Sequence, residues 1–397
     1  MTRWIKNFEE VVATGVPLAL GRFPAFVYGR PLGRSEIPVF CYHSATPDSF
    51  EAALRFLKDN QYRTLTVHEL YEISAGGHAA VPERAVVLTF DDGVRSVWSV
   101  IYPLLKKYGY SATVFLIPGR MKSSGMSPSL EDVWNGRISA AGLEAADRAA
   151  DSLATWQEVA DMHASGAIDF QSHTFSHSLI QVSPRIVDFA TPETLSRYHP
   201  FEFAVAGDRE GLPDTALPRL GTPLHAAASR MGEARRWLTD SGLAEACTRF
   251  VAENGGEGFF APGWRRRIDQ VVRRYRRAHG VSARYETPAE QYAAMLVDLR
   301  RARATIEGHL PGKAAVHLCY PWGVASDLAI AASQEAGYRS GLWGPMRRRV
   351  RWDPYRIRRL GEDFFPLLPG RGRSSLRSVL VRKLTRRVKE GSPYFAH

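Results

Sequence analysis

Two aspartates stand side by side in "VVLTFDDG", residues 86–93, directly after an apolar run. Each negative charge raises the cost of its neighbour, so a place at the end of a buried strand requires a nearby cation. A solvated loop is the alternative interpretation of the pair. Because the apolar run argues for burial, Asp91 and Asp92 are candidate functional residues.

A pair of histidines provides the partner for these carboxylates. "SHTFSH" places His173 and His177 four residues apart, a spacing that turns both imidazoles to one side of a helical turn. Taken alone, these histidines could be ordinary polar residues. Together with Asp92 they form a three-ligand set that suits Zn²⁺ and leaves positions open for water and substrate. Asp91 would then stay ionised beside the metal and act on the water.

The elements that must position these residues are those of an α/β fold. Short β-rich runs alternate with amphipathic helical patterns, which is typical of parallel strands connected by helices. Residues just past the carboxyl ends of parallel strands form the reaction site in such folds. We therefore expect the aspartates, the histidines, His43 and "CYPWG" (319–323) to converge at the ends of strands within 37–43, 85–92, 111–117, 167–173, 315–321 and 338–343.

Three apolar stripes predict helices between these strands. Their members recur at helical spacing, and we expect each stripe to face the core. The stripes are Phe50, Leu54 and Leu57; Val97, Ile101, Leu104 and Leu105; and Tyr292, Met295, Leu296 and Leu299.

Length and composition set the limits. The 397 residues are long for one domain and suit a barrel or layered core of roughly 250 residues with additions. The three cysteines, Cys41, Cys247 and Cys319, are too scattered for a disulfide framework, which indicates a reducing compartment. We find neither a clear signal peptide nor an apolar run long enough to span a bilayer. The expected location is cytoplasmic, possibly peripheral to the inner face of the membrane.

The net charge of +11 is concentrated in 264–280, 346–359 and 371–389, away from the aspartate pair. Charge is the only sign of nucleic-acid binding, so we expect no nucleic-acid partner. In the last segment, Leu376, Leu380, Leu384 and Val388 form an apolar stripe on a basic helix. Such a helix can contact an anionic membrane surface, or it can pack on the core with its charges solvated.

"LTFDDG", "SHTFSH" and "YPWG", in this order, resemble the leading motifs of the NodB-like polysaccharide deacetylases, carbohydrate esterase family four. "PVFCYHS" is similar to the opening of the Tyr-His branch, which includes exopolysaccharide deacetylases. The resemblance covers 37–185 and 286–366 and implies a distorted, TIM-like (β/α) barrel. The remaining parts are an N-terminal extension (1–36), a large helical insertion (186–285) and a basic C-terminal tail (367–397).

The resemblance also implies roles for individual residues. Asp92, His173 and His177 match the ligands of one divalent metal, most readily Zn²⁺, with Co²⁺, Ni²⁺ or Fe²⁺ possible. Asp91 matches the general base. Backbone N–H groups around Tyr320, Pro321 and Trp322 match the oxyanion-binding motif, and these aromatic residues could instead pack the barrel rim.

The sequence departs from the family pattern at two places. Cys319 stands where much of the family has an arginine that orients the base, and the usual C-terminal Leu-x-His motif is missing. In the Tyr-His branch His43 is the expected acid, although it could also be an ordinary histidine at the end of a strand. His163, His309 and His317 are interpreted as structural.

The implied reaction removes N-acetyl groups from amino sugars of a polysaccharide or its lipid-linked precursor. Within the same fold, a hydrolase of a small amide, formamide or cyclic imide is the alternative. An inactive carbohydrate-binding protein is an alternative of another class, which the intact aspartates and histidines disfavour.

Overall fold

The computed structural model describes residues 16–33, 36–76, 81–149, 153–197, 202–205, 217–239, 241–281, 283–345 and 352–390. The chain forms two compact units, which are described separately. The first comprises Met1–His173, Arg303–Gly323 and Gly337–His397, and the second comprises Thr174–Ala302 and Val324–Ala336. Residues 1–15 of the expected N-terminal extension lie outside the described part.

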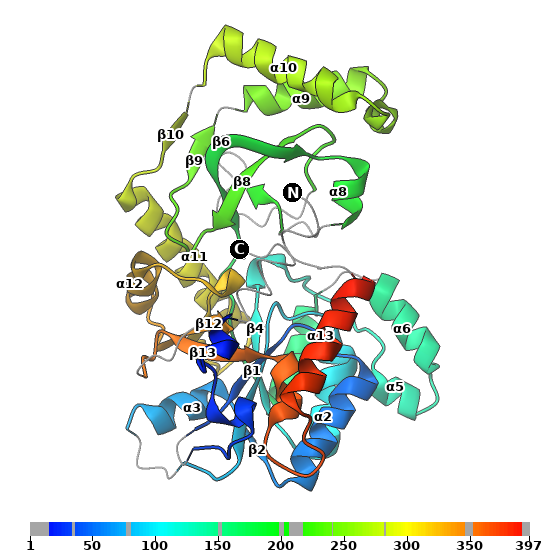
Figure 1. Cartoon of the computed structure of the whole chain (residues 1–397), viewed down its shortest axis with the longest axis vertical. Coiled ribbons are helices and arrows are strands. Elements are labelled where there is room, and N and C mark those ends of the chain that lie inside the picture. Colours follow the sequence, from blue (N-terminus) through cyan, green and yellow to red (C-terminus); the bar gives the residue numbers. More distant parts are fainter. Residues whose placement is uncertain are drawn as a thin grey trace. The chain divides into compact units, whose positions relative to one another are not determined.

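A closed ring of seven parallel strands forms the centre of the first unit (Figure 1). The order around the ring is β1, β13, β12, β11, β5, β4 and β3, and β2 pairs with the first half of β3. This confirms the predicted barrel. The strands are β1 (Val39–Tyr42), β2 (Arg63–Leu65), β3 (Ala85–Phe90), β4 (Ala112–Leu116), β5 (Ile168–Ser172), β11 (His317–Cys319), β12 (Ser340–Pro345) and β13 (Ile357–Gly361).

Helices follow most of these strands, as the apolar stripes predicted. Phe50, Leu54 and Leu57 are buried on α2. Val97, Ile101, Leu104 and Leu105 are buried along a π-helical turn (Val97–Ile101) and the helix after it. The helices of this unit are α2 (Pro47–Asp59), α3 (Val67–Ser74), α4 (Tyr102–Tyr108), α5 (Leu130–Trp134), α6 (Ala140–Ala149), α7 (Trp156–Ala164) and α13 (Leu376–Glu390).

Strands β1, β3 and β4 are largely apolar on both faces because both faces are buried, which is why they appear in the sequence as nearly continuous hydrophobic runs. One face contributes to a cluster that contains Val39, Val87, Phe115, Cys319, Leu342 and Ile357. The other contributes to a larger cluster with the helices, including Phe40, Leu88 and Phe90. Period-two alternation along β1 and β3 thus separates the two layers.

Both chain ends pack on the barrel where the structure describes them. Phe26 and Val27 are fully buried in the larger cluster, so part of the expected N-terminal extension belongs to the barrel core. Leu376, Val379 and Leu380 of α13 pack against the same cluster. The prediction that this stripe contacts a membrane is therefore wrong for Leu376 and Leu380. The side chains of Leu384 and Val388 lie outside the described part.

No helix in the described part of the chain is both long enough and apolar enough to span a bilayer.

The second unit contains antiparallel strands as well as helices, so the prediction of a purely helical insertion is wrong. "HAAAS" (225–229), expected as helix, lies in β8 and pairs with β6. The unit begins at Thr174 rather than at residue 186. Its strands are β6 (Leu179–Phe189), β7 (Ala204–Val205), β8 (Pro223–Ser229), β9 (Trp237–Thr239) and β10 (Ala283–Tyr285).

The helices of the second unit close over an apolar core of their own. Phe189, Cys247, Phe259 and Ile268 belong to this core, and α10 lies alongside α9 (Figure 1). The helices are α8 (Pro192–Arg197), α9 (Gly242–Glu253), α10 (Trp264–His279), α11 (Pro288–His309), which continues into the first unit, and α12 (Asp327–Glu335). On α11 the predicted stripe is buried at Met295, Leu296 and Leu299.

Candidate active site

Strand register brings the predicted residues to one end of the barrel. Tyr42 of β1 is paired with Phe90 of β3, and the Asp91 N–H donates to the Tyr42 carbonyl at 2.9 Å. On the next strands, the His173 N–H donates to the Leu116 carbonyl at 2.7 Å. His43, Asp91 and His173 therefore all leave their strands at the carboxyl edge, where barrel enzymes place their chemistry.

Asp91 is held by an arginine that the sequence analysis did not identify. The Nη1 and Nη2 atoms of Arg359 donate to Oδ1 and Oδ2 of Asp91 at 2.6 and 2.8 Å. The guanidinium also donates to the Trp343 carbonyl and to the Thr89 hydroxyl, at 2.9 and 3.2 Å. Such a two-pronged contact fixes both the position and the plane of the carboxylate.

Two thiols complete the surroundings of Asp91. The Sγ atoms of Cys41 and Cys319 both donate to Oδ2, each at 3.6 Å. Burial raises the pKa of both thiols above its ordinary value, although Arg359 opposes the shift. Oδ2 thus accepts three hydrogen bonds, one from Arg359 and two from protonated thiols. Oδ1 accepts one of the hydrogen bonds of Arg359. This asymmetry leaves Oδ1 the better proton acceptor.

The charge state of Asp91 follows from these contacts. Burial is the largest single effect and would raise its pKa, but the charges of Arg359 and His173, the Arg359 hydrogen bonds and the charge of His43 together outweigh it. The pKa of Asp91 therefore lies well below its usual range, and the group is a carboxylate at neutral pH.

Asp92, His173 and His177 are buried, and each offers one ligand atom within 4.8 Å of the other two. Asp92 Oδ1 lies 3.5 Å from His173 Nε2. His173 Nδ1 lies 2.8 Å from the Cys319 carbonyl, to which it can only donate, so the Nε2 lone pair is directed toward Asp92. Two imidazoles and one carboxylate in this arrangement fit a divalent metal, above all Zn²⁺.

Asp91, His173 and Cys319 also lie within 4.8 Å of one another. This second set suits a cation poorly. Arg359 occupies both oxygens of Asp91 and places a positive charge at the site, and burial keeps Cys319 protonated. Since metals bind thiolates, the set with Asp92 and His177 is the better site.

Backbone strain is concentrated at these residues. Six described residues other than glycine have positive φ, and four of them are Asp92, Thr174, His177 and Trp322, at 69°, 63°, 52° and 61°. Left-handed conformations of this kind cost of order 1–3 kcal/mol and persist where the surroundings enforce them. The strain marks the loops after β3, β5 and β11 as functional.

Gly93 explains why the aspartates are followed by glycine. Its φ is 70°, and an added Cβ would lie 2.7 Å from Leu116 Cδ2. A side chain at this position would therefore push the turn away from β4.

His43 follows β1 and is exposed, and it and Asp91 each come one residue after the paired Tyr42 and Phe90. Its charge contributes to the low pKa of Asp91, which places the two side chains within electrostatic reach. The structure thus brings His43 to the predicted edge of the barrel. Its role as the acid stays a prediction.

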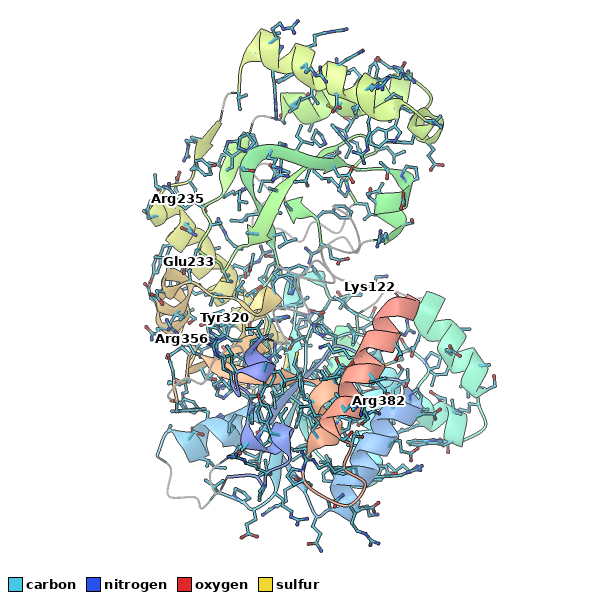
Figure 2. All side chains as sticks on the ribbon, viewed as in Figure 1. Lys122, Glu233, Arg235, Tyr320, Arg356 and Arg382 are labelled. Carbon is cyan, nitrogen blue, oxygen red and sulfur yellow. The ribbon has the colours of Figure 1, made fainter. Side chains whose placement is uncertain are left out.

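The "YPWG" turn departs from its predicted role in one respect. The Tyr320 N–H donates to the Leu342 carbonyl at 3.0 Å, and Pro321 has no N–H. Neither can bind an oxyanion through its amide, which leaves the Trp322 N–H as the candidate of this stretch. Tyr320, labelled in Figure 2, is fully buried with its ring against Trp343, as in the alternative interpretation that it packs the barrel.

The sequence around Arg359 contains a pattern that indicates a buried arginine, although the residue also belongs to the basic stretch 346–359. In "RIRRLG", Arg359 is two residues after Ile357 and shares its face of a strand. Ile357 lies in the interior cluster of the barrel, so Arg359 points inward as well. Alternation therefore predicts a buried arginine once the stretch is recognised as a strand.

Comparison with known proteins identifies this region. The family model described as "Polysaccharide deacetylase" matches residues 78–196, which include both aspartates and both histidines. A putative polysaccharide deacetylase, YxkH of Bacillus subtilis (strain 168), is 36% identical over 91 residues, 21% of this chain and 32% of that protein. The poly-β-1,6-N-acetyl-D-glucosamine N-deacetylase of Escherichia coli (strain K12) is 29% identical over 143 residues, 36% of this chain and 19% of that protein.

The matched stretches thus span about a third or less of these relatives. Among solved structures, the deacetylase domain of BpsB from Bordetella bronchiseptica aligns with 84% of this chain and 97% of its own, with 17% identity and a TM-score of 0.49. Residues 78–196, which include the two aspartates and the two histidines, thus match the polysaccharide deacetylase family model.

Proposed function

We propose that this protein is a metal-dependent hydrolase that removes N-acetyl groups from the amino sugars of a polysaccharide. The observation that carries the proposal is an ionised Asp91, held by Arg359, next to the group formed by Asp92, His173 and His177. All four of these acidic and histidine residues lie within the matched residues 78–196. A β-1,6-linked N-acetylglucosamine polymer is the first substrate to test, because several relatives are named for deacetylating it.

Asp92, His173 and His177 would hold the metal, with Zn²⁺ as the expected ion. When bound, the ion supplies positive charge that polarises the attacking water and the amide carbonyl. Oδ1 of Asp91 takes a proton from the water while the water oxygen attacks the carbonyl carbon of the acetyl group. Arg359 and the two thiols hold the carboxylate in place, so that Oδ1 need not reorganise.

The second half of the reaction needs an acid. The amine leaves when the bond between carbon and nitrogen breaks, and it is a poor leaving group until its nitrogen is protonated. His43 is exposed at the barrel edge next to Asp91, and a histidine side chain can serve as a general acid there. We assign His43 to donate this proton, which gives a free amine and acetate as the products.

The test is to incubate the purified, metal-loaded protein with a β-1,6-linked N-acetylglucosamine oligomer and to measure acetate and free amine together. Equal yields of the two products are expected. Asp91→Asn is the control, because it keeps the shape but removes the proton acceptor, and its turnover should fall by roughly 10²-fold or more.

The other functional classes give different results in this assay. A catalytically inactive carbohydrate-binding protein would bind the oligomer and release no acetate. A hydrolase of small amides would leave the oligomer intact and cleave a formamide or a cyclic imide. Either result would overturn the proposal.

A further inference from the structure

The loop that carries His177 has little regular structure of its own. It connects β5, which ends at Ser172, to β6, which begins at Leu179. Thr174 and His177 both have positive φ, and the His177 N–H donates to the Thr174 hydroxyl at 3.1 Å. A strained six-residue connection of this kind holds one geometry only if something outside it fixes the backbone.

Asp298 of α11 provides such a connection. Its Oδ1 accepts the Phe175 N–H at 2.8 Å, and its Oδ2 accepts the Ser176 hydroxyl at 2.5 Å. The Ser178 hydroxyl donates in turn to the Ser176 oxygen at 2.7 Å. One carboxylate therefore holds the two residues that directly precede His177, and a hydroxyl chain extends this contact to the residue after it.

The surroundings make these hydrogen bonds strong. Asp298, Phe175, Ser176 and Ser178 are all buried. Hydrogen bonds to an ionised group are stronger than neutral ones, and low local polarity increases the difference. Arg301, one helical turn beyond Asp298, adds a cation–π contact, with its Cζ 3.9 Å from the centre of the Phe175 ring. Two residues of one helix thus fix the same short stretch of backbone.

A buried aspartate in the middle of α11 is costly. Aspartate is a weak helix former, and a buried carboxylate loses its hydration. The packing of α11 itself comes from apolar residues such as Met295 and Leu299. The Phe175 N–H and the Ser176 hydroxyl, both in the His177 loop, help to offset this cost.

We infer that Asp298 is a positioning residue for the metal site: it holds the 174–178 loop so that His177 keeps the orientation needed for metal binding. The inference rests on the ligands assigned under the proposed function. Residues that orient metal ligands typically change metal affinity by 10–100-fold when they are replaced. We expect an effect of this size from Asp298.

The test compares metal affinity in the original protein, three variants and one control, measured by competition with a chromogenic chelator for Co²⁺ and for Zn²⁺. Asp298→Asn should weaken binding 10–100-fold, because the amide has only one accepting oxygen for the Phe175 N–H and the Ser176 hydroxyl, and its NH2 group cannot accept the other. Ser176→Ala should weaken it less, since the Phe175 N–H keeps its acceptor. In the double variant the losses should not add, because both changes break one contact.

Glu290→Gln is the matched control. Glu290 lies on the same helix, and its carboxylate also accepts a backbone N–H, that of Thr287 at 2.7 Å, but it is exposed. This change should leave the affinity for both metals unchanged. The Co²⁺ absorption spectrum should shift in Asp298→Asn and not in the control.

Thermal unfolding of the metal-free proteins separates positioning from general stability. Metal affinity in Asp298→Asn within twofold of the original protein, with a lower unfolding temperature, would show a purely structural role and overturn the inference. If Asp298→Asn does not fold, Ser176→Ala decides the matter, and an unchanged affinity in that variant rejects it. Absence of metal binding by the original protein would instead contradict the proposed function.

Discussion

Both terminal nitrogens of Arg359 donate to the Asp91 carboxylate, and the two residues are 268 positions apart in the chain. The pair is buried in the barrel, with the guanidinium bound on its other side by Thr89 and the Trp343 carbonyl. Arg359 thus fixes the Asp91 carboxylate from β13, whereas the resemblance led us to look for an arginine at the position of Cys319.

Replacing Arg359 should harm both stability and catalysis. Arg359→Gln leaves a buried carboxylate without its charge partner, which costs about 3–5 kcal/mol in the free energy of unfolding. Turnover should fall in Arg359→Lys as well, because a single ammonium cannot fix the carboxylate plane. Urea titration and acetate release measure the two effects. The control Arg300→Gln, which loses an exposed pair with Glu335, should cost less than about 1 kcal/mol, and a similar cost for both would contradict the assignment.

Removing a proposed metal ligand should remove the metal. Asp92→Ala and His173→Ala are expected to lose the single divalent ion that the original protein retains after dialysis, as measured by elemental analysis. His279→Ala, which changes an exposed histidine of α10, should retain it. If both ligand variants keep a full complement of metal, the ion binds elsewhere.

His43→Ala should separate the two halves of the reaction. His43 is exposed, so the protein should stay folded, with a change in unfolding free energy within about 0.5 kcal/mol, and should keep its metal. Amide hydrolysis should fall by roughly 10²-fold or more, because protonation of the leaving amine is lost. An activated ester, whose leaving group needs little protonation, should be hydrolysed at close to the original rate. Equal losses on amide and ester would assign His43 to substrate positioning instead.

His317 should make the fold sensitive to mild acid. Burial above all, together with the charge of His68, whose Nδ1 lies 3.0 Å from His317 Nε2, lowers the pKa of His317 to about 3. The unfolded chain takes up this proton below about pH 6.5 and the folded chain does not. The free energy of unfolding should therefore fall as pH decreases from about 6.5 toward 3, by at most about 1.4 kcal/mol per pH unit from this group.

Denaturant titrations at pH 7 and pH 5 measure this dependence. His317→Gln should flatten it, whereas His309→Gln should not, because His309 is exposed, although its ring stacks on Trp156 and its Nδ1 lies 2.9 Å from the Thr305 carbonyl. A steeper or unchanged dependence in His317→Gln would show that other groups cause it.

The sequence by itself determined the parts of this protein that depend on neighbours along the chain. Buried parallel strands are continuous apolar runs, so the strands ending at Tyr42, Phe90 and Ser172 could be recognised one by one. The rule that parallel strands present their carboxyl ends on one side then predicted that His43, the aspartates and the histidines converge. None of these steps required knowledge of which strands are adjacent.

Local sequence patterns predict the wrong element where strand pairing outweighs intrinsic helix propensity. "HAAAS" is rich in alanine, which favours a helix, yet it forms β8 because β6 offers it an antiparallel partner. The apolar stripe on α13 could face a membrane or the core. The sequence left both open, and only the tertiary structure shows that Leu376 and Leu380 pack against the larger apolar cluster.

Tertiary structure alone decided how the base is held. Cys41, Cys319 and Arg359 come from three strands that are far apart in the chain, and nothing in their own neighbourhoods indicates that they share Asp91. The same holds for Asp298, which contacts the Ser176 hydroxyl across 122 positions. The physical reason is that a buried charge must find its partners in space, and closure of the barrel, rather than local sequence, determines which side chains are within reach.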